Sequence, residues 1–213
     1  MTIRAYEPGD DALAIKLWND SLPMDQIDNE NFYTRIIYDV NFDREKYLLA
    51  FDGNEPAGFL YCTKRLVHDE IGGLEPDKAW IVAMGVRPDF RRRGVGKALL
   101  ETAEHKLAAA GVTQIVVGAY ATNYFCPGVD QASYAGGSAF FESLGYAIGG
   151  ECCSMDINLH GYAYPEKYIE RRCQLEARGY TFNQYQDADA VPLLEFMRES
   201  FPHWQPNARS CAL

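Results

Sequence analysis

The sequence lacks the features that would place the protein at or across a membrane. Its 213 residues contain no apolar run near the roughly 18 residues that a membrane-spanning helix needs. The N-terminal stretch MTIRAYEPGDD has neither the basic start nor the apolar segment of a signal peptide, so we expect a cytoplasmic protein without a membrane partner. Hydrophobic residues make up 47% of the chain and aromatic residues 13%, which is enough to build a core.

Metal-ligand and disulfide patterns are missing as well. The chain has six cysteines but no CxxC pair, and its four histidines are scattered singly. None of the cysteines stands near a histidine at the spacing of zinc ligands. We therefore expect reduced thiols and no structural metal.

Positive charge is scarce in this chain. It carries 20 Lys and Arg against 30 Asp and Glu, a formal net charge of -10 at pH 7. Nucleic-acid backbones are bound through an excess of Lys and Arg, so this balance argues against a nucleic-acid partner and is compatible with a cationic substrate. One basic turn contrasts with the rest, because Arg91, Arg92 and Arg93 lead directly into Gly-Val-Gly-Lys.

Segments typical of strands and helices alternate along the first 160 residues. Period-two alternation, helical spacing of apolar residues and turn residues define their limits. Because helices connect the strands, we expect an α/β or α+β sheet with helices on its faces. The expected strands are 2–6, the hairpin 47–66, 79–86, 113–119 and 152–159, and the expected helices are 9–20, 29–40, one that follows Arg93 and ends at Gly111, and 138–145.

The C-terminal fifty residues contain a weak internal repeat. Residues 2–23, shifted by 179 positions, align without a gap with residues 181–202, with five identities in 22 positions and a shared apolar helix pattern. We interpret this segment as an incomplete second copy of the N-terminal strand-helix unit, joined by a linking helix over 164–179. One strand and one helix cannot bury their apolar face alone, so the segment must dock on the first domain, on another chain or on a part of the protein beyond this sequence.

The basic turn combines three ways of binding an anion. Between Arg91 and Ala98 the sequence brings together cationic side chains, the unpaired N–H groups of a first helical turn and the positive end of the helix dipole. Gly94 and Gly96 let the backbone approach a ligand closely and permit positive φ. The ligand that suits this turn is a phosphate or pyrophosphate.

Two common phosphate-binding motifs do not fit the turn. A P-loop has glycine where this chain has Arg91 and a hydroxyl residue where it has Ala98. A Rossmann fingerprint needs a third glycine at the position of Leu99, and it should follow the first strand of the fold. The sequence therefore argues against both types of site.

The motif Arg91-x-x-Gly94-x-Gly96 resembles the acyl-CoA pyrophosphate motif of the GNAT N-acetyltransferase superfamily. Val86-Arg87-Pro88, directly upstream, is similar to the family's V-x-P. AFFESLGY, which starts at residue 139, is similar to the family's later helix motif, and the order of elements extends the resemblance from residue 1 to about 160.

The resemblance implies a fold and a division of the chain. The fold is α+β, an α/β/α sandwich whose mixed, mostly antiparallel sheet has a splayed central strand pair and is flanked by helices. Residues 1–160 would form the acyl-CoA-binding N-acetyltransferase domain, and residues 161–213 the linker helix and the partial repeat.

The resemblance also implies an enzyme that transfers an acyl group, in the first place acetyl from acetyl-CoA, to a primary amine by direct attack in a ternary complex. The backbone of Met84, Gly85 and Val86 is expected to bond the pantetheine arm and the thioester carbonyl, where a donor stabilises the oxyanion. Positioning amine and thioester together removes an entropic barrier. The other expected CoA-binding residues are Arg91, Arg92, Arg93, Gly94, Val95, Gly96, Lys97, Ala98, Asn123 and Phe140.

One catalytic position departs from the family's pattern. The family's frequent acid is a tyrosine, whereas this chain has Phe141, whose ring cannot donate a proton. The inserted segment 119–141 carries Tyr120, Tyr124 and Tyr134, and its Gly, Pro and aromatic content is typical of a loop that lines a pocket. We expect Tyr134 to be the acid, with Tyr124 as the second candidate.

The general base is less well defined by the sequence. Residues 81–83 of the expected motif strand are all apolar, although many relatives carry a carboxylate on this strand. Glu75 is the first candidate, and His68, Asp77 and Asp130 are alternatives that would act through a water.

Two alternatives to direct transfer remain open. Cys126, beside Pro127 in a loop, is a candidate nucleophile for an acyl-enzyme route, although direct attack is the usual route in the family. The other alternative is a regulatory module that binds CoA without transferring an acyl group and docks a partner through the partial repeat.

The expected acceptor is a small-molecule or peptide amine, with polyamine, aminoglycoside, amino acid, peptide N-terminus and protein lysine all compatible, and the expected assembly is a homodimer that involves the C-terminal segment.

Overall fold

The computed structural model describes residues 1–68, 73–120, 126–153, 155, 157–205 and 208. The chain divides into two compact units, Met1–Ala147 and Ile148–Leu213, which are described separately below. The expected boundary after residue 160 lies inside the second unit and stays a prediction.

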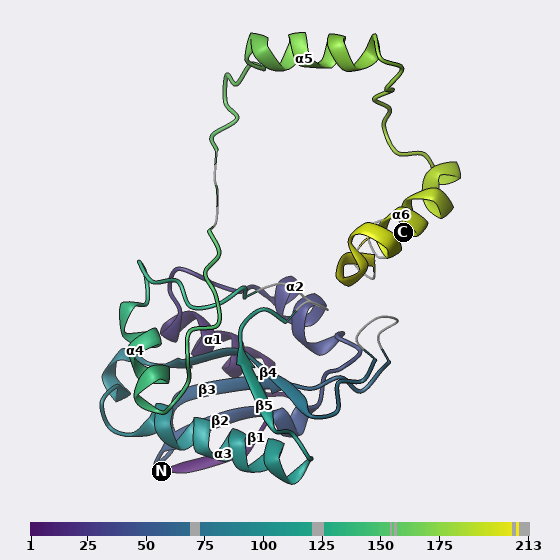
Figure 1. Ribbon diagram of the computed structural model, residues 1–213. Helices are drawn as coiled ribbons and strands as arrows, with labels where there is room; N and C mark the ends of the chain where they lie inside the picture. Colours follow the sequence, from purple (N-terminus) through teal and green to yellow (C-terminus); the bar gives the residue numbers. More distant parts are fainter. Residues whose placement is uncertain (69–72, 121–125, 154, 156, 206–207, 209–213) are drawn as a thin grey trace. The chain divides into compact units, whose positions relative to one another are not determined.

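A five-stranded sheet forms the centre of the first unit (Figure 1). Its strands lie in the order β1-β2-β3-β4-β5. From β1 to β4 each strand is antiparallel to the next, and β5 is parallel to β4. This confirms the expected mixed, mostly antiparallel sheet of an α+β fold. The strands are β1 (Thr2–Ala5), β2 (Tyr47–Asp52), β3 (Glu55–Thr63), β4 (Lys78–Val86) and β5 (Gln114–Val117).

Among the described residues of the first unit, four α-helices accompany the sheet. They are α1 (Asp11–Ser21), α2 (Asn29–Phe32), α3 (Val95–Ala109) and α4 (Ala135–Ser143). The second predicted helix, over 29–40, is shorter than expected. A π-helical turn over Tyr33–Ile37 continues α2, and the helix ends before residue 40. Gly111, with φ +81°, follows the end of α3 as predicted, since glycine adopts this left-handed conformation without strain. Short 3-10 turns at Arg44–Lys46 and Pro88–Phe90 lead into β2 and away from β4.

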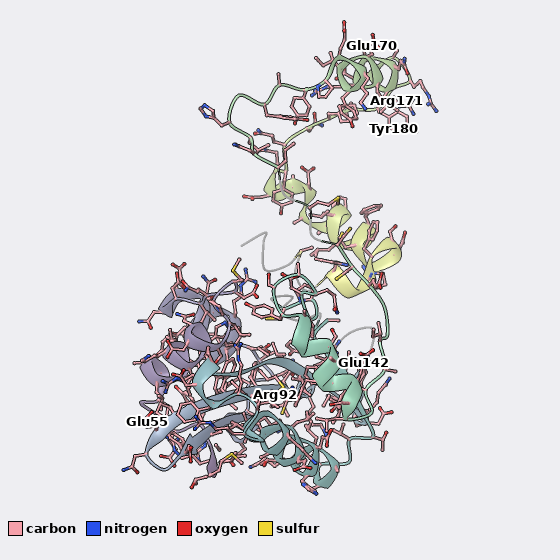
Figure 2. All side chains as sticks on the ribbon, turned by 90° about the vertical axis from the view of Figure 1, so that its left-hand side faces the viewer. Glu55, Arg92, Glu142, Glu170, Arg171 and Tyr180 are labelled. Atoms are coloured by element: carbon pink, nitrogen blue, oxygen red, sulfur yellow. The ribbon has the colours of Figure 1, made fainter. Side chains whose placement is uncertain are left out.

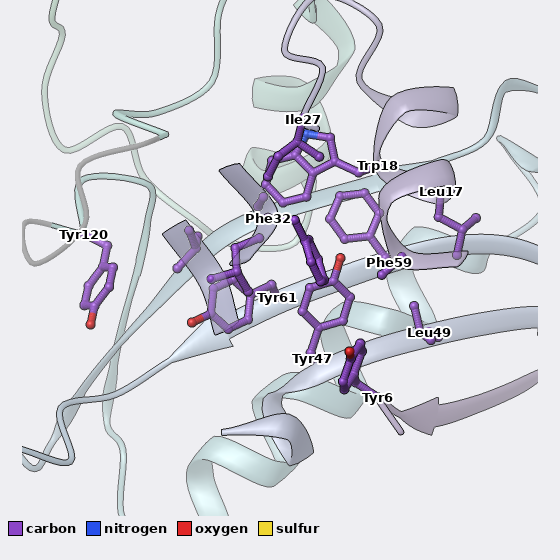
Figure 3. Close-up of a cluster of buried hydrophobic side chains, with 14 of the residues drawn as sticks. Tyr6, Leu17, Trp18, Ile27, Phe32, Tyr47, Leu49, Phe59, Tyr61 and Tyr120 are labelled. Carbon is purple, nitrogen blue, oxygen red and sulfur yellow. The ribbon is translucent and has the colours of Figure 1, made fainter. Parts of the chain in front are cut away.

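The sheet separates two hydrophobic clusters. On the face covered by α1 and α2, the Trp18 ring stacks on Phe59 with 5.1 Å between ring centroids, and Tyr47 stacks on Phe59 and Tyr61 at 6.0 and 5.5 Å (Figure 3). The opposite face packs against the apolar side of α3 and against Phe141 of α4. The helical spacing predicts an apolar face of Leu99, Ala103, Leu107 and Ala110, of which α3 buries the first three, whereas Ala110 follows the helix and is exposed.

The expected strand over residues 152–159 is not formed. The described residues of this segment belong to no strand, and Met155, Ile157 and Leu159 are 89, 66 and 67% exposed. The prediction was wrong because alternation of apolar and polar residues favours a strand only where a neighbouring strand pairs with it.

The second unit contains α5 (Glu166–Glu176) within the expected linker, followed by α6 (Ala190–Ser200). α6 begins and ends 179 residues after α1, which is the spacing of the sequence repeat. The counterpart of β1, residues 181–184, is not a strand, so only the helical half of the repeat has the expected structure. Val191 and Phe196 of α6 are 66 and 53% exposed, and the homodimer through this segment stays a prediction.

Among the described residues, no helix is both long enough and apolar enough to cross a membrane. α3, with 15 residues, is the longest of the helices given above.

The aromatic stack on the α1 face makes a prediction about stability. Phe59 is 0% exposed, and replacing it with alanine leaves a cavity between Trp18 and Tyr47. We expect Phe59→Ala to lower the free energy of unfolding by about 3–5 kcal/mol in urea denaturation. Tyr38→Ala removes a ring that is 70% exposed and should change the free energy of unfolding by less than about 0.5 kcal/mol. Equal losses in the two variants would contradict this account of the core.

Candidate active site

The central feature of the site is the separation of β4 from β5. The two strands pair from Lys78 to Ile81, and the last bond between them in the described structure runs from the Gly118 N–H to the Ile81 carbonyl at 2.8 Å. At Gly118, whose φ is +71°, the chain turns away while β4 continues to Val86. In the described part of the chain, Val82 to Val86 therefore have no β5 partner, and their main chain can pair with an extended ligand.

The basic turn follows β4 and ends at the start of α3. Gly94 has φ +84° and immediately precedes Val95, the first residue of the helix. Arg92 also has positive φ, +62°, and such left-handed residues turn successive N–H groups towards one side, which makes a concave anion site. No side chain caps α3 in the described structure, so the N–H groups of its first turn and the helix dipole face an incoming anion.

The side chain of Arg91 holds the turn in place. Its Nε donates to the Val86 carbonyl at 2.9 Å, and its Nη2 donates to the Ser21 carbonyl at 3.1 Å. The guanidinium thus joins the end of α1 to the end of β4. These bonds give Arg91 a part in holding the turn, and its contact with a phosphate stays a prediction.

Of the other basic residues at the turn, two have anionic neighbours. Arg93 lies 3.8 Å from Asp52 and Lys97 lies 3.7 Å from Glu101, and all four side chains are more than half exposed. Such exposed pairs are weak, so they leave both cations available. Arg92, labelled in Figure 2, forms no ion pair with any residue that the structure describes.

The two adjacent phenylalanines of α4 have different surroundings. Phe140 lies at the basic turn, because a Cβ added at Gly96 would be 3.4 Å from the Phe140 ring and 3.6 Å from Cγ2 of Val86. Phe141 is buried in the core on the α3 face, with its ring 5.4 Å from Tyr146. A hydroxyl group at position 141 would point into the core, so an acid must come from another residue.

The end of α1 forms a wall beside the open part of β4. A Cβ added at Gly85 would lie 2.5 Å from Cβ of Ser21 and 2.9 Å from the Phe59 ring. Glycine is therefore needed at position 85 because helix and strand pack in direct contact. The Ser21 hydroxyl is buried there without a hydrogen-bond partner among the described residues.

Tyr134 lies at the N-terminus of α4 and contacts the loop that follows α1. Its hydroxyl accepts a hydrogen bond from the Met24 N–H at 3.1 Å. Burial and a hydrogen bond to Asp25 raise the pKa of Tyr134 to about 12. The phenol therefore keeps its proton at neutral pH, as a proton donor must, and it lies near the same end of α1 that packs on Gly85.

Glu75 does not join these residues. It precedes β4 and lies beside Lys78, so the strand separates it from Met84 by roughly 20 Å at 3.3 Å per residue. Its carboxylate pairs with Arg65 at 2.8 Å and Lys78 at 3.0 Å. Burial raises the pKa of Glu75, but the hydrogen bonds from these two cations outweigh burial and lower it. A carboxylate so engaged is a weak base.

The alternative bases are placed as follows. The Asp77 carbonyl accepts bonds from Thr113 and Gln114 at the same remote end of β4. His68 lies near Gly73, in the loop between β3 and β4. Asp130 accepts from the Ala132 N–H at 2.8 Å, and hydrogen bonds, first from the Ser133 side chain, lower its pKa. Of these three, Asp77 lies away from the open part of β4, and the roles of His68 and Asp130 stay predictions.

The remaining candidates are Asn123, Tyr124 and Cys126. Asn123 and Tyr124 lie outside the described residues. Burial raises the pKa of the Cys126 thiol to about 12, so little thiolate exists at neutral pH. Because the thiolate is the nucleophilic form, this surrounding disfavours the acyl-enzyme route.

Sequence reasoning did not identify one group of polar residues. Asp39 and Asn41 follow the α2 region, and tertiary structure brings them against the hydroxyl of Tyr120. No local motif marks Asp39, and the loop that carries it is joined to Tyr120 over 81 sequence positions. Sequence spacing therefore carried no signal for this contact.

An α+β sheet with an open central edge beside an anion-binding helix start defines a class of CoA-dependent transferases. The model of the acetyltransferase (GNAT) family matches residues 13–125, and the chain belongs to this family. The expected acyl-CoA-dependent N-acetyltransferase is thereby confirmed, with acetyl-CoA as its co-substrate. A search of curated proteins found no match.

Solved structures share the fold at low sequence identity. A transcriptional regulator from Bacillus halodurans is similar over 73% of this chain and 99% of its own, with 19% identity and a TM-score of 0.53. A ribosomal-protein-alanine N-acetyltransferase from Brucella melitensis matches over 74% and 100%, with 14% identity and a TM-score of 0.52. AAC(6')-Iy, in complex with a CoA-containing bisubstrate analogue, matches over 74% and 97%, with 16% identity and a TM-score of 0.53.

The contacts of Arg91 and Arg92 predict different effects when each is replaced with alanine. Arg91→Ala removes the bonds to Val86 and Ser21, so we expect a lower melting temperature without ligand and weaker acetyl-CoA binding. Arg92→Ala should weaken acetyl-CoA binding, by up to about tenfold, while the melting temperature of the free protein stays that of the wild type. Calorimetric titration and thermal unfolding measure the two effects. A destabilised Arg92 variant, or an Arg91 variant of unchanged stability, would contradict these roles.

Proposed function

We propose that this protein transfers the acetyl group of acetyl-CoA to a primary amine by direct attack in a ternary complex. The observation that carries the proposal is the unpaired edge of β4, from Val82 to Val86, next to the uncapped start of α3. The open edge of β4 suits the extended arm of CoA, and the uncapped start of α3 suits its diphosphate.

In this proposal the main chain of β4 and the turn share the binding of CoA. Met84, Gly85 and Val86 bond the pantetheine arm, and one donor of this edge stabilises the oxyanion that forms when the amine attacks the thioester. The first turn of α3 binds the pyrophosphate. The full proposed set is Met84, Gly85, Val86, Arg91, Arg92, Arg93, Gly94, Val95, Gly96, Lys97, Ala98, Asn123 and Phe140, with Arg91 acting through Val86 and Ser21.

Tyr134 is the proposed acid that protonates the departing CoA thiolate, with Tyr124 as the second candidate. Its support is a hydroxyl that keeps its proton and that lies against the loop after α1. Proton loss from the attacking amine is proposed to occur through water, because Glu75 is held in ion pairs at the far end of β4. The high pKa of Cys126 supports direct attack over an acyl-cysteine intermediate.

Binding of the co-substrate is tested by thermal unfolding. Acetyl-CoA at a hundred times its Kd should stabilise the native protein by about 2.7 kcal/mol, and Gly94→Glu should abolish the shift because it adds a negative charge and a side chain at φ +84°. Gly9→Glu is a matched control, since Gly9 also has positive φ, +101°, with nothing within 4 Å of its added Cβ, but precedes α1, at the opposite end of that helix from Ser21. A shift that persists in Gly94→Glu would contradict the proposed site.

Transfer is tested by the release of free thiol from acetyl-CoA with a panel of primary amines. We expect thiol release above the hydrolysis rate for at least one amine, and none in Gly94→Glu. Stabilisation by acetyl-CoA without thiol release from any amine would instead favour the module that binds CoA and transfers nothing.

The role of Tyr134 makes a separate prediction. Tyr134→Phe removes the hydroxyl and keeps the ring, so we expect kcat to fall about 100-fold or more while stabilisation by acetyl-CoA is retained. Tyr38→Phe, which changes an exposed tyrosine, controls for the loss of a hydroxyl. An unchanged kcat in Tyr134→Phe would remove this residue from the proposal.

A further inference from the structure

A second polar group lies on the α1 face of the sheet, apart from the residues assigned to CoA. It consists of Asp39 and Asn41 after the α2 region, Tyr61 on β3 and Tyr120 beyond β5. Figure 3 shows the Tyr61 hydroxyl turned towards the side of the sheet where Tyr120 lies. Burial is the main cause that raises the pKa of Tyr61, and the negative charge of Asp39, which acts on this hydroxyl, raises it further.

One oxygen of the Asp39 carboxylate is held firmly. Oδ1 accepts from the Asn41 N–H at 2.8 Å and from the Tyr120 hydroxyl at 3.2 Å. The Asn41 side chain in turn donates to the Tyr120 hydroxyl at 2.7 Å and accepts from the Leu66 N–H at 2.7 Å. Because its neighbours are themselves fixed, the carboxylate has a defined orientation before any ligand binds.

The other oxygen of this carboxylate lacks a partner. Oδ2 of Asp39 is buried and forms no hydrogen bond within the described structure, and the same is true of the Tyr61 hydroxyl, whose side chain is 0% exposed. Leaving a buried polar group unpaired is unfavourable, and it is more unfavourable for a charged group. Oδ2 of Asp39 can only accept, whereas the Tyr61 hydroxyl can donate or accept, so a donor to Oδ2 is missing from the described residues.

The nearest basic side chain is already engaged. Nε of Arg65 donates to Glu75 at 2.8 Å, and its guanidinium lies 5.3 Å from the Trp80 ring centroid. Its charge lowers the pKa of Asp39, but burial is the larger effect and raises it. The carboxylate is thus incompletely compensated by its own chain.

The polar group lies close to the proposed point of acyl transfer. Tyr61 pairs across the sheet with Ala83, the residue before Met84, and Tyr120 follows Gly118, where the chain leaves β4. The Asp39 carboxylate is therefore about one tyrosine side chain away from the open part of β4.

We propose that Asp39 Oδ2 and the Tyr61 hydroxyl bind a second, non-reacting ammonium group of the acceptor, so that the preferred acceptors are diamines or polyamines. This inference rests on the proposed acyl transfer. A buried carboxylate stabilises the charged form of an amine, whereas the attacking amine must be neutral. The group bound at Asp39 is therefore the one that does not react, and a net charge of -10 favours the approach of such a cation.

The test compares 1,4-diaminobutane with butylamine as acceptors, by thiol release. We expect the wild type to prefer the diamine in kcat/KM by at least tenfold, and Asp39→Asn to bring the ratio close to one, mainly through a higher KM for the diamine. Thermal unfolding without substrate should show Asp39→Asn at least as stable as the wild type, because the variant removes an uncompensated buried charge.

Asp10→Asn is the matched control. Asp10 is also a largely buried carboxylate, but it is paired with Arg4, which donates to it at 2.9 Å. This variant should lower the melting temperature and keep the diamine preference. If Asp39 had a purely structural role, Asp39→Asn would likewise lower the melting temperature and keep the diamine preference.

The outcomes separate the two proposals. An unchanged diamine preference in Asp39→Asn, or no preference in the wild type, overturns the cation site. Either result indicates that a water molecule, not an ammonium group, bonds Asp39 Oδ2 and the Tyr61 hydroxyl. If neither amine releases thiol, calorimetric titration with 1,4-diaminobutane decides. Binding to the wild type but not to Asp39→Asn retains the cation site while acyl transfer fails, and equal binding or no binding overturns the site.

Discussion

The early end of the β4–β5 ladder is the constraint on which the rest of the site depends. Four residue pairs join the two strands, and then Gly118 turns the chain away while β4 runs on to Val86. A strand edge inside a folded protein carries unpaired N–H and C=O groups, and these must find a partner. In the proposed function the pantetheine arm of CoA is this partner, and it brings the thioester to the end of the ladder.

The packing around this edge explains why its glycines and Arg91 lie where they do. Gly85 lets α1 approach β4 so closely that a methyl group would clash with Ser21. Arg91 then bonds both Ser21 and Val86, so the end of the helix, the end of the strand and the basic turn form one rigid corner. The uncapped first turn of α3 is held against this corner and offers its dipole to an anion.

The two faces of the sheet have different roles. The α3 face is a hydrophobic core that supports the turn and includes Phe141. The α1 face is rich in aromatic rings, but it also carries the buried polar atoms of Ser21, Asp39 and Tyr61, which have no partner among the described residues. Buried polar groups of this kind are unfavourable for folding alone, so they mark the face where we expect the acceptor to bind.

The sequence by itself determined the local features: the periodicity of α3, the hairpin, the Gly94 turn and, through Arg91-x-x-Gly94-x-Gly96, the family. These depend on neighbours a few residues apart, for which spacing is enough. Only the tertiary structure decided which side chains meet. It separated Glu75 from Met84 by the length of a strand, turned Arg91 inward, and brought Asp39 to Tyr120 across 81 positions. Contacts between distant segments arise from packing, which no local pattern encodes, and the unformed strand at 152–159 shows the same dependence on a partner.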